Sequence, residues 1–178
     1  MRGSVADVLA IFGPTASGKS AVAEEIEAAA AAAPDVATST RDVYLIFLER
    51  FRDNVAAAVR AVAHAPEGGV VIHCVGGKDR TGLLAAFLLH LAGVPDDEIA
   101  ADYALSEERL LPRHEAWFAA ATSDEELERL RRIAQTPAAS MEGVFAELER
   151  RYGGVEAYLR DVGVSEDELE LARARLRG

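Results

Sequence analysis

The single cysteine of this chain lies in a ten-residue segment whose residue types suit nucleophilic chemistry on a phosphate group. Residues 73–82 read HCVGGKDRTG, between an apolar run and a helix-forming run. Backbone N–H groups of such a loop and of the helix start converge on one point, which suits a phosphate dianion. The same donors stabilise a thiolate, so we expect Cys74 to have a lowered pKa and to be nucleophilic near neutral pH.

Other residues of this loop have the properties that phosphate binding requires. The planar guanidinium of Arg80 can hold two phosphoryl oxygens at once, which a lysine cannot do. Gly76 and Gly77 let the backbone approach a ligand closely, and Lys78 adds positive charge at the rim. The candidate phosphate-binding residues are Val75, Gly76, Gly77, Lys78 and Thr81.

Residues 73–82 resemble the signature loop HCxxGKDRTG of bacterial cysteine-dependent protein tyrosine phosphatases, and every fixed position is present. The similarity continues in residues 101–106 and 151–159 and covers about Tyr44 to the C-terminus. It implies three catalytic residues: Cys74 as nucleophile, Asp79 as general acid and Arg80 as phosphate binder. In this branch Lys78 is associated with broad substrates, including phosphoinositides.

The resemblance implies hydrolysis of phosphomonoesters through a phosphocysteine intermediate. The thiolate attacks phosphorus, the Asp79 carboxyl protonates the leaving oxygen, and water then releases phosphate. The Thr81 hydroxyl can hydrogen-bond the sulfur as it leaves. The competing interpretation is a structural cysteine on a glycine-rich turn, and ten contiguous matching residues favour catalysis over it.

A second motif, GPTASGKS at residues 13–20, has the full GxxxxGKS pattern of a phosphate-binding loop. It is similar to the opening of the tRNA dimethylallyltransferases over residues 8–33. The candidate nucleotide-binding residues are Gly13, Gly18, Lys19 and Ser20, with Lys19 reaching phosphate oxygens and Ser20 holding Mg²⁺. No later apolar strand ends in an Asp that could help to hold the Mg²⁺ of a bound nucleotide. The alternative left open is a nucleotide- or phosphate-binding module with an inactive phosphatase part. A Mg-nucleotide is expected as a ligand only under this alternative.

The other polar candidates are assigned structural roles. His64, His90 and His114 lie far apart without the spacing of metal ligands, so we expect no metal and no cofactor. Asp102 and Tyr103 could approach the loop, but helix packing is the simpler interpretation.

Two short apolar runs, residues 8–12 and 70–73, predict buried parallel strands that end in glycine-rich turns. Helices are expected over about 18–33, 42–65 and 83–91, and everything after that reads as helical. The predicted fold class is therefore α/β, with a short, mainly parallel sheet flanked by helices and a helical C-terminal half. Because two strands make no stable sheet, a third is expected near 35–40 or from a partner chain, which leaves an oligomer open.

The composition predicts one domain over residues 1–178, in which residues 1–40 form a P-loop-like βα unit. With 50% apolar residues the chain can build a core, and its net charge of −11 repels nucleic acid and anionic lipid. No apolar run approaches the roughly 20 residues of a membrane span, so we expect no stable membrane anchoring and a cytoplasmic location. The expected partner is a phosphotyrosine protein or another phosphomonoester, such as a phosphoinositide.

Overall fold

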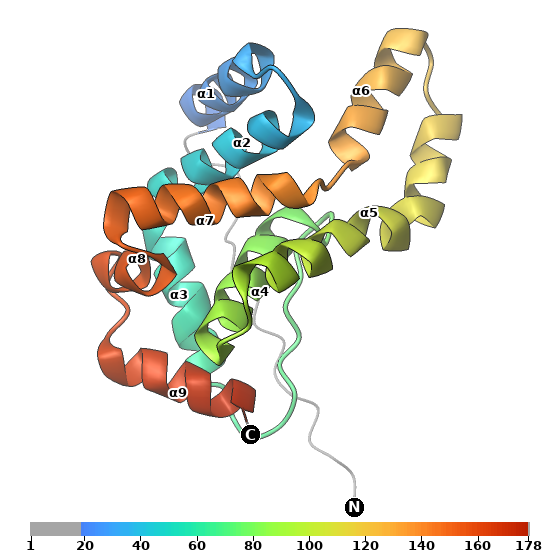
Figure 1. Ribbon diagram of the computed structural model, residues 1–178. Coiled ribbons are helices and arrows are strands. Elements are labelled where there is room, and N and C mark those ends of the chain that lie inside the picture. Colours follow the sequence, from blue (N-terminus) through green and yellow to red (C-terminus); the bar gives the residue numbers. More distant parts are fainter. Residues whose placement is uncertain (1–18, 178) are drawn as a thin grey trace, which may run out of the picture.

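The computed structural model describes residues 19–177, which form nine α-helices (Figure 1). In chain order these are α1 Lys19–Ala32, α2 Val36–Arg50, α3 Arg52–Ala63, α4 Asp79–Ala92, α5 Asp96–Ala119, α6 Asp124–Ala134, α7 Ala138–Tyr152, α8 Val155–Asp161 and α9 Glu166–Arg177.

The predicted parallel sheet is wrong for the described residues, none of which forms a strand. Residues 70–73 are irregular, and Val70 and Val71 are 40% and 69% exposed. A strand is stable only when a neighbour pairs with its N–H and C=O groups, and the described part of the chain offers none. Residues 35–40 supply no third strand, because α2 begins at Val36. The other predicted strand, residues 8–12, lies outside the described residues.

The long helix expected over residues 42–65 is interrupted once, at Phe51. This residue leaves helical geometry, with φ −121° and ψ 37°, and separates α2 from α3. The two helices then pack on different neighbours, α2 on α1 and α7, and α3 mainly on α9. The interruption therefore lets one amphipathic stretch cover two surfaces.

Polar side chains cap the starts of α2 and α9. Asp35 caps α2 by accepting a hydrogen bond from the Thr38 N–H at 2.7 Å. Before α9, the Ser165 hydroxyl accepts from the Glu168 N–H, and a Glu168 carboxylate oxygen accepts from the Ser165 N–H at 2.8 Å. This reciprocal pair is a capping box, which stabilises the last helix of the chain.

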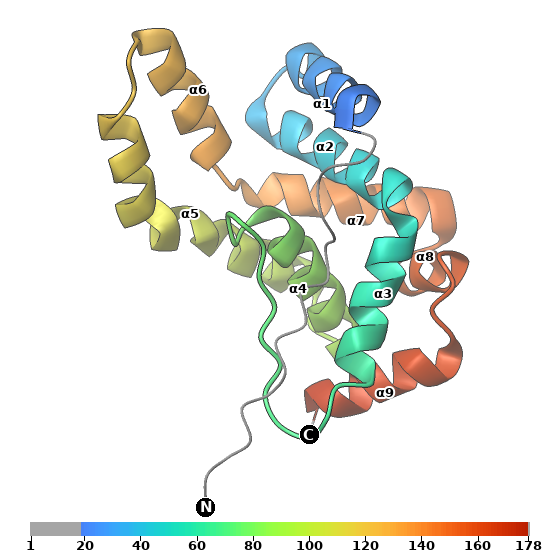
Figure 2. The same ribbon diagram turned by 180° about the vertical axis from the view of Figure 1, so that it is seen from behind.

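Helix α4 lies among α3, α5, α8 and α9 in the middle of the fold (Figures 1 and 2). Its Phe87 is fully buried and its ring lies 5.9 Å from that of Tyr158 on α8. The Tyr158 hydroxyl donates to the Leu48 carbonyl of α2 at 2.8 Å. The helix that follows the cysteine loop is thus fixed by the core on several sides.

Helix α9 also fixes the segment that leads into the cysteine loop. The Arg175 guanidinium donates to the carbonyls of Ala65, Pro66 and Gly68 at 2.7 to 2.8 Å. Arg177 donates to the carbonyl of Ala92 at the end of α4. Both ends of residues 65–92 are therefore attached to the last helix.

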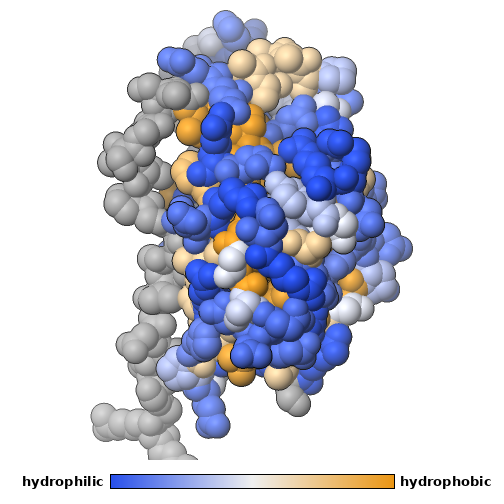
Figure 3. Space-filling view, turned by 90° about the vertical axis from the view of Figure 1, so that its left-hand side faces the viewer, coloured by the Kyte–Doolittle hydropathy of each residue, from blue (hydrophilic) through white to orange (hydrophobic). Residues whose placement is uncertain are grey.

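The surface seen in Figure 3 is mainly hydrophilic, with apolar side chains in small patches. Many charged side chains of residues 19–177 form ion pairs at the surface, such as Arg150–Glu147 and Arg160–Glu166, and each such pair contributes little stability. No helix within residues 19–177 is long and apolar enough to cross a lipid bilayer.

We predict that Phe87→Ala lowers the free energy of unfolding by about 3–5 kcal/mol, because it removes a buried ring and leaves a cavity. Chemical denaturation measures this difference. Leu105→Ala on α5 is the control, because Leu105 is 42% exposed, and its effect should stay within about 0.5–1 kcal/mol. Equal effects of the two substitutions would contradict the central place of α4.

Candidate active site

The loop from Cys74 to Lys78 ends where Asp79 begins α4, so the cysteine and the N-terminus of that helix lie next to each other. Gly77 has φ +81°, a left-handed conformation that favours glycine. Its N–H donates a hydrogen bond to Cys74 Sγ at 3.2 Å. The turn thus bends the backbone so that an amide faces the sulfur.

The surroundings of Cys74 favour its thiolate. Burial by itself raises the pKa of the thiol. Hydrogen bonds from Thr81 and Gly77, together with the charge of Arg80, outweigh burial and bring the pKa below its ordinary value of 9.0. The Thr81 hydroxyl is buried and makes no close hydrogen bond within residues 19–177, so it is available to donate to the sulfur when the thiolate forms. The lowered pKa favours the thiolate, which is the nucleophilic form of cysteine.

Asp79 and Lys78 form an ion pair beside the loop. The Lys78 ammonium and the Tyr44 hydroxyl both donate to Asp79 Oδ1, each at 2.8 Å. Lys78 is only 7% exposed, so its charge is buried against Asp79 and does not lie at the exposed rim that the sequence suggested. Arg80 follows Asp79 in the first turn of α4. Phosphate binding by Lys78 and Arg80 remains a prediction.

The second half of α5, beyond Pro112, flanks the same loop. Arg113 donates to the Val75 carbonyl at 3.2 Å and lies over the Trp117 ring, 5.2 Å from its centroid. His114 is buried, and burial, followed by the charges of Lys78 and Arg113, lowers its pKa below the ordinary value of 6.5. The lowered pKa favours the uncharged form of this buried ring.

Sequence reasoning missed three residues that the structure brings to this site. Tyr44 and Arg113 were given no role, and Tyr103 was assigned to packing, yet the Tyr103 and Tyr44 hydroxyl oxygens lie 2.8 Å apart. They come from α2 and α5, far from residues 73–82 in the chain. Asp102, the neighbour of Tyr103, is exposed. The family-like segment at residues 101–106 was the available signal for Tyr103.

The remaining predicted residues divide between the loop and the beginning of the chain. Val75 is 81% exposed, and Gly76 lies beside Asp79. Gly13 and Gly18, the predicted nucleotide-binding glycines, lie outside the described residues. Lys19 and Ser20 begin α1, but their side chains also lie outside what the structure describes. Within residues 19–177, no group of three or more His, Cys, Asp or Glu side chains is placed to hold a metal ion.

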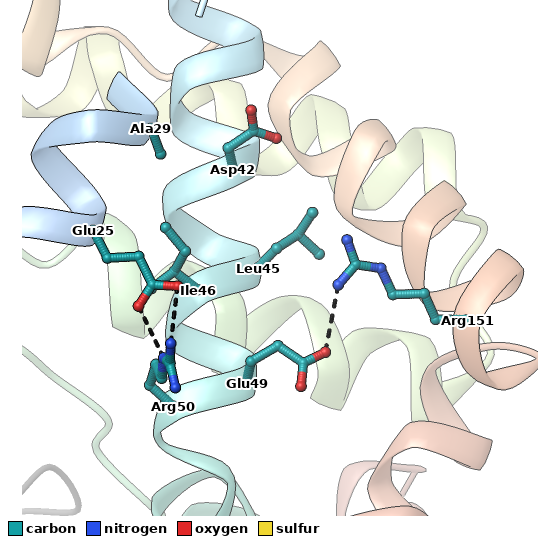
Figure 4. Close-up of a pocket in the computed structure, with 8 residues that line it drawn as sticks. All are labelled: Glu25, Ala29, Asp42, Leu45, Ile46, Glu49, Arg50 and Arg151. Atoms are coloured by element: carbon teal, nitrogen blue, oxygen red, sulfur yellow. Dashed lines mark hydrogen bonds and ion pairs between the residues drawn. The ribbon is translucent and has the colours of Figure 1, made fainter. Parts of the chain in front are cut away.

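A separate pocket of about 440 Å³ lies between α1, α2 and α7 (Figure 4). Its guanidinium groups are paired with carboxylates, Arg50 with Glu25 at 2.9 Å and Arg151 with Glu49 at 3.4 Å. No residue of the cysteine loop lines it. Because its cations are already paired, this pocket does not resemble a phosphate site.

We predict that Thr81→Ala raises the pKa of Cys74, because the substitution removes one of the hydrogen bonds that favour the thiolate. The pH dependence of Cys74 alkylation by an iodoacetamide reagent measures this pKa. Thr122→Ala is the matched control, since the Thr122 hydroxyl donates to Glu126 and not to the cysteine. An unchanged alkylation midpoint in Thr81→Ala would show that the hydroxyl does not act on the sulfur.

The chain is similar in sequence to proteins that are named as phosphatases. The chain is 33% identical to a tyrosine-protein phosphatase of Nostoc commune in an alignment of 150 residues that covers 78% of this chain and 49% of that protein. It is 31% identical to the triple specificity protein phosphatase PtpB of Mycobacterium tuberculosis in an alignment of 123 residues that covers 61% of this chain and 44% of that protein. The chain thus spans about half the length of these curated relatives.

The model of the tyrosine phosphatase family matches residues 4–178. The match confirms the resemblance found in residues 73–82 and extends it beyond the expected start at Tyr44. It includes the GPTASGKS segment, and so gives no support to a separate nucleotide-binding module. With its cysteine loop at the start of α4 and a family match over nearly its whole length, this chain belongs to the tyrosine phosphatase family.

Proposed function

We propose that this protein hydrolyses phosphomonoesters, phosphotyrosine in particular, through a phosphocysteine intermediate on Cys74. The observation that carries the proposal is the position of the Cys74 sulfur, which faces the Gly77 N–H at the start of α4 and has a lowered pKa. A thiolate in this position can attack a phosphorus atom bound at the helix N-terminus.

In the first step, the Cys74 thiolate forms an S–P bond while the bond from phosphorus to the ester oxygen breaks. The Asp79 carboxyl gives its proton to that oxygen, so the product leaves as a neutral alcohol or phenol. Arg80 and the loop N–H groups hold the negative charge on the equatorial oxygens. In oxyanion holes, one preorganised donor of this kind contributes about 3–4 kcal/mol to the stability of the transition state.

In the second step, water attacks the phosphorus of phosphocysteine and gives a proton to the Asp79 carboxylate. The S–P bond breaks and the sulfur leaves as a thiolate, which Thr81 and Gly77 stabilise by hydrogen bonding. The cycle restores both the thiolate and the protonated carboxyl. The scheme uses only side chains of this protein, the phosphate ester and water.

The proposed substrates are phosphotyrosine proteins, with other phosphomonoesters such as phosphoinositides as further candidates. Both relatives are named as protein phosphatases, and the Mycobacterium protein is named as having triple specificity, which supports a site open to several phosphomonoesters. A reducing compartment suits the chemistry, because Cys74 must remain a free thiol. We therefore place the activity in the cytoplasm as part of the proposal.

Hydrolysis of an aryl phosphate tests the proposal. We expect turnover that is unchanged by EDTA, lost in Cys74→Ser, and about a hundredfold lower in Arg80→Lys, which cannot hold two phosphoryl oxygens in the same way. Arg109→Lys, an exposed arginine on α5, is the matched control and should keep full activity. Turnover that persists in Cys74→Ser would contradict the mechanism.

A further inference from the structure

The two carboxyl oxygens of Asp79 lie in different surroundings. Oδ1 accepts hydrogen bonds from both Tyr44 and Lys78. Oδ2 is turned toward the loop, since a Cβ atom added to Gly76 would lie 3.8 Å from it. The carboxyl group is therefore held by one oxygen while the other faces the segment that carries the cysteine.

A chain of two hydroxyl groups leads to the anchored oxygen. Tyr44 donates its proton to Asp79 Oδ1, so the hydrogen bond between the two tyrosines, 2.8 Å long, must use the proton of Tyr103. The rings meet edge to face, with centroids 6.2 Å apart. Burial, followed by the charge of Asp79, raises the pKa of Tyr44, and burial likewise raises that of Tyr103. Both hydroxyls therefore remain protonated donors.

Packing among three helices fixes this chain of hydroxyls. Tyr44 belongs to α2, Tyr103 to α5 and Asp79 to α4, and the two tyrosines are 1% and 4% exposed. A Cβ atom at Gly82 would lie 3.1 Å from the Tyr103 ring. The glycine at this position of the loop sequence thus lets the ring pack against the first turn of α4.

We propose that Tyr44 and Tyr103 are positioning residues for Asp79: they hold Oδ1, so that the transferable proton stays on Oδ2 and is delivered to the leaving oxygen. This inference rests on the proposed phosphatase function. When Oδ2 gives up its proton, the electron pair of the O–H bond stays on the carboxylate. The hydroxyl of Tyr44 and the ammonium of Lys78 already face the negative charge that results.

The test compares a series of phosphate esters whose leaving groups range from good to poor. Tyr44→Phe keeps the ring and removes only the hydroxyl. We expect it to lower kcat about tenfold for the poorest leaving groups and to leave the best ones nearly unchanged, because only poor leaving groups need the proton. Tyr103→Phe should act in the same direction, by about threefold, since it reaches Asp79 only through Tyr44.

Two controls separate positioning from a general structural effect. Tyr158→Phe removes another buried hydroxyl, one that donates to Leu48, and should leave the dependence on the leaving group unchanged. In Asp79→Asn, which has no proton to deliver, adding Tyr44→Phe should cause no further loss with poor leaving groups. Thermal unfolding checks that each variant is folded, and Tyr103→Phe provides the test if Tyr44→Phe does not fold.

The possible results separate this inference from the function on which it rests. An active parent protein whose tyrosine variants slow all esters equally, or not at all, would overturn the positioning role alone. Losses in Tyr44→Phe that add fully to those of Asp79→Asn would also overturn it. A parent protein that hydrolyses none of the esters would overturn both proposals.

Discussion

The site depends on one contact, between the sulfur of Cys74 and the amide groups at the start of α4. The Gly77 N–H donates to the sulfur, and Thr81 in the first helical turn helps to lower its pKa. Partial positive charge at a helix N-terminus favours a thiolate and a phosphate alike. The rest of the fold can be understood by how it holds this helix and this loop together.

The hydrophobic core holds α4, and the last helix holds the segment before the loop. Phe87 is buried against Tyr158, while Arg175 binds the carbonyls of residues 65, 66 and 68. Besides Lys78, whose charge is paired with Asp79, two cationic side chains, Arg80 and Arg113, lie in or beside the loop although the chain carries a net charge of −11. An anionic substrate would thus be attracted locally and not by the protein as a whole.

How far the sequence predicts this site depends on whether a feature is local. The glycine-rich turn at Gly77 and a helix after it follow from a few neighbouring residues, although α4 begins at Asp79 and not at residue 83 as expected. Residues 70–73 misled the prediction, because a short apolar run has the same pattern whether or not another strand pairs with it. Pairing is a long-range property, and the described part of the chain contains no partner.

The contacts of Asp79 show the same limit. Tyr44 lies 35 residues from Asp79 in the chain and 59 from Tyr103, and no spacing rule joins positions so far apart. Lys78 looked like an exposed cation, since a charged residue in a loop is usually solvated, but its ammonium is buried on Asp79. Only the packing of α2 and α5 against α4 brings these groups together.

The most direct measurement is a search for the phosphorylated enzyme during turnover. The reaction with an aryl phosphate would be stopped rapidly under denaturing conditions, and the digested protein analysed by mass spectrometry. The account predicts one phosphoryl group, attached to Cys74 and absent when substrate is left out. A phosphoryl group on another residue, with Cys74 unmodified while substrate is consumed, would contradict it.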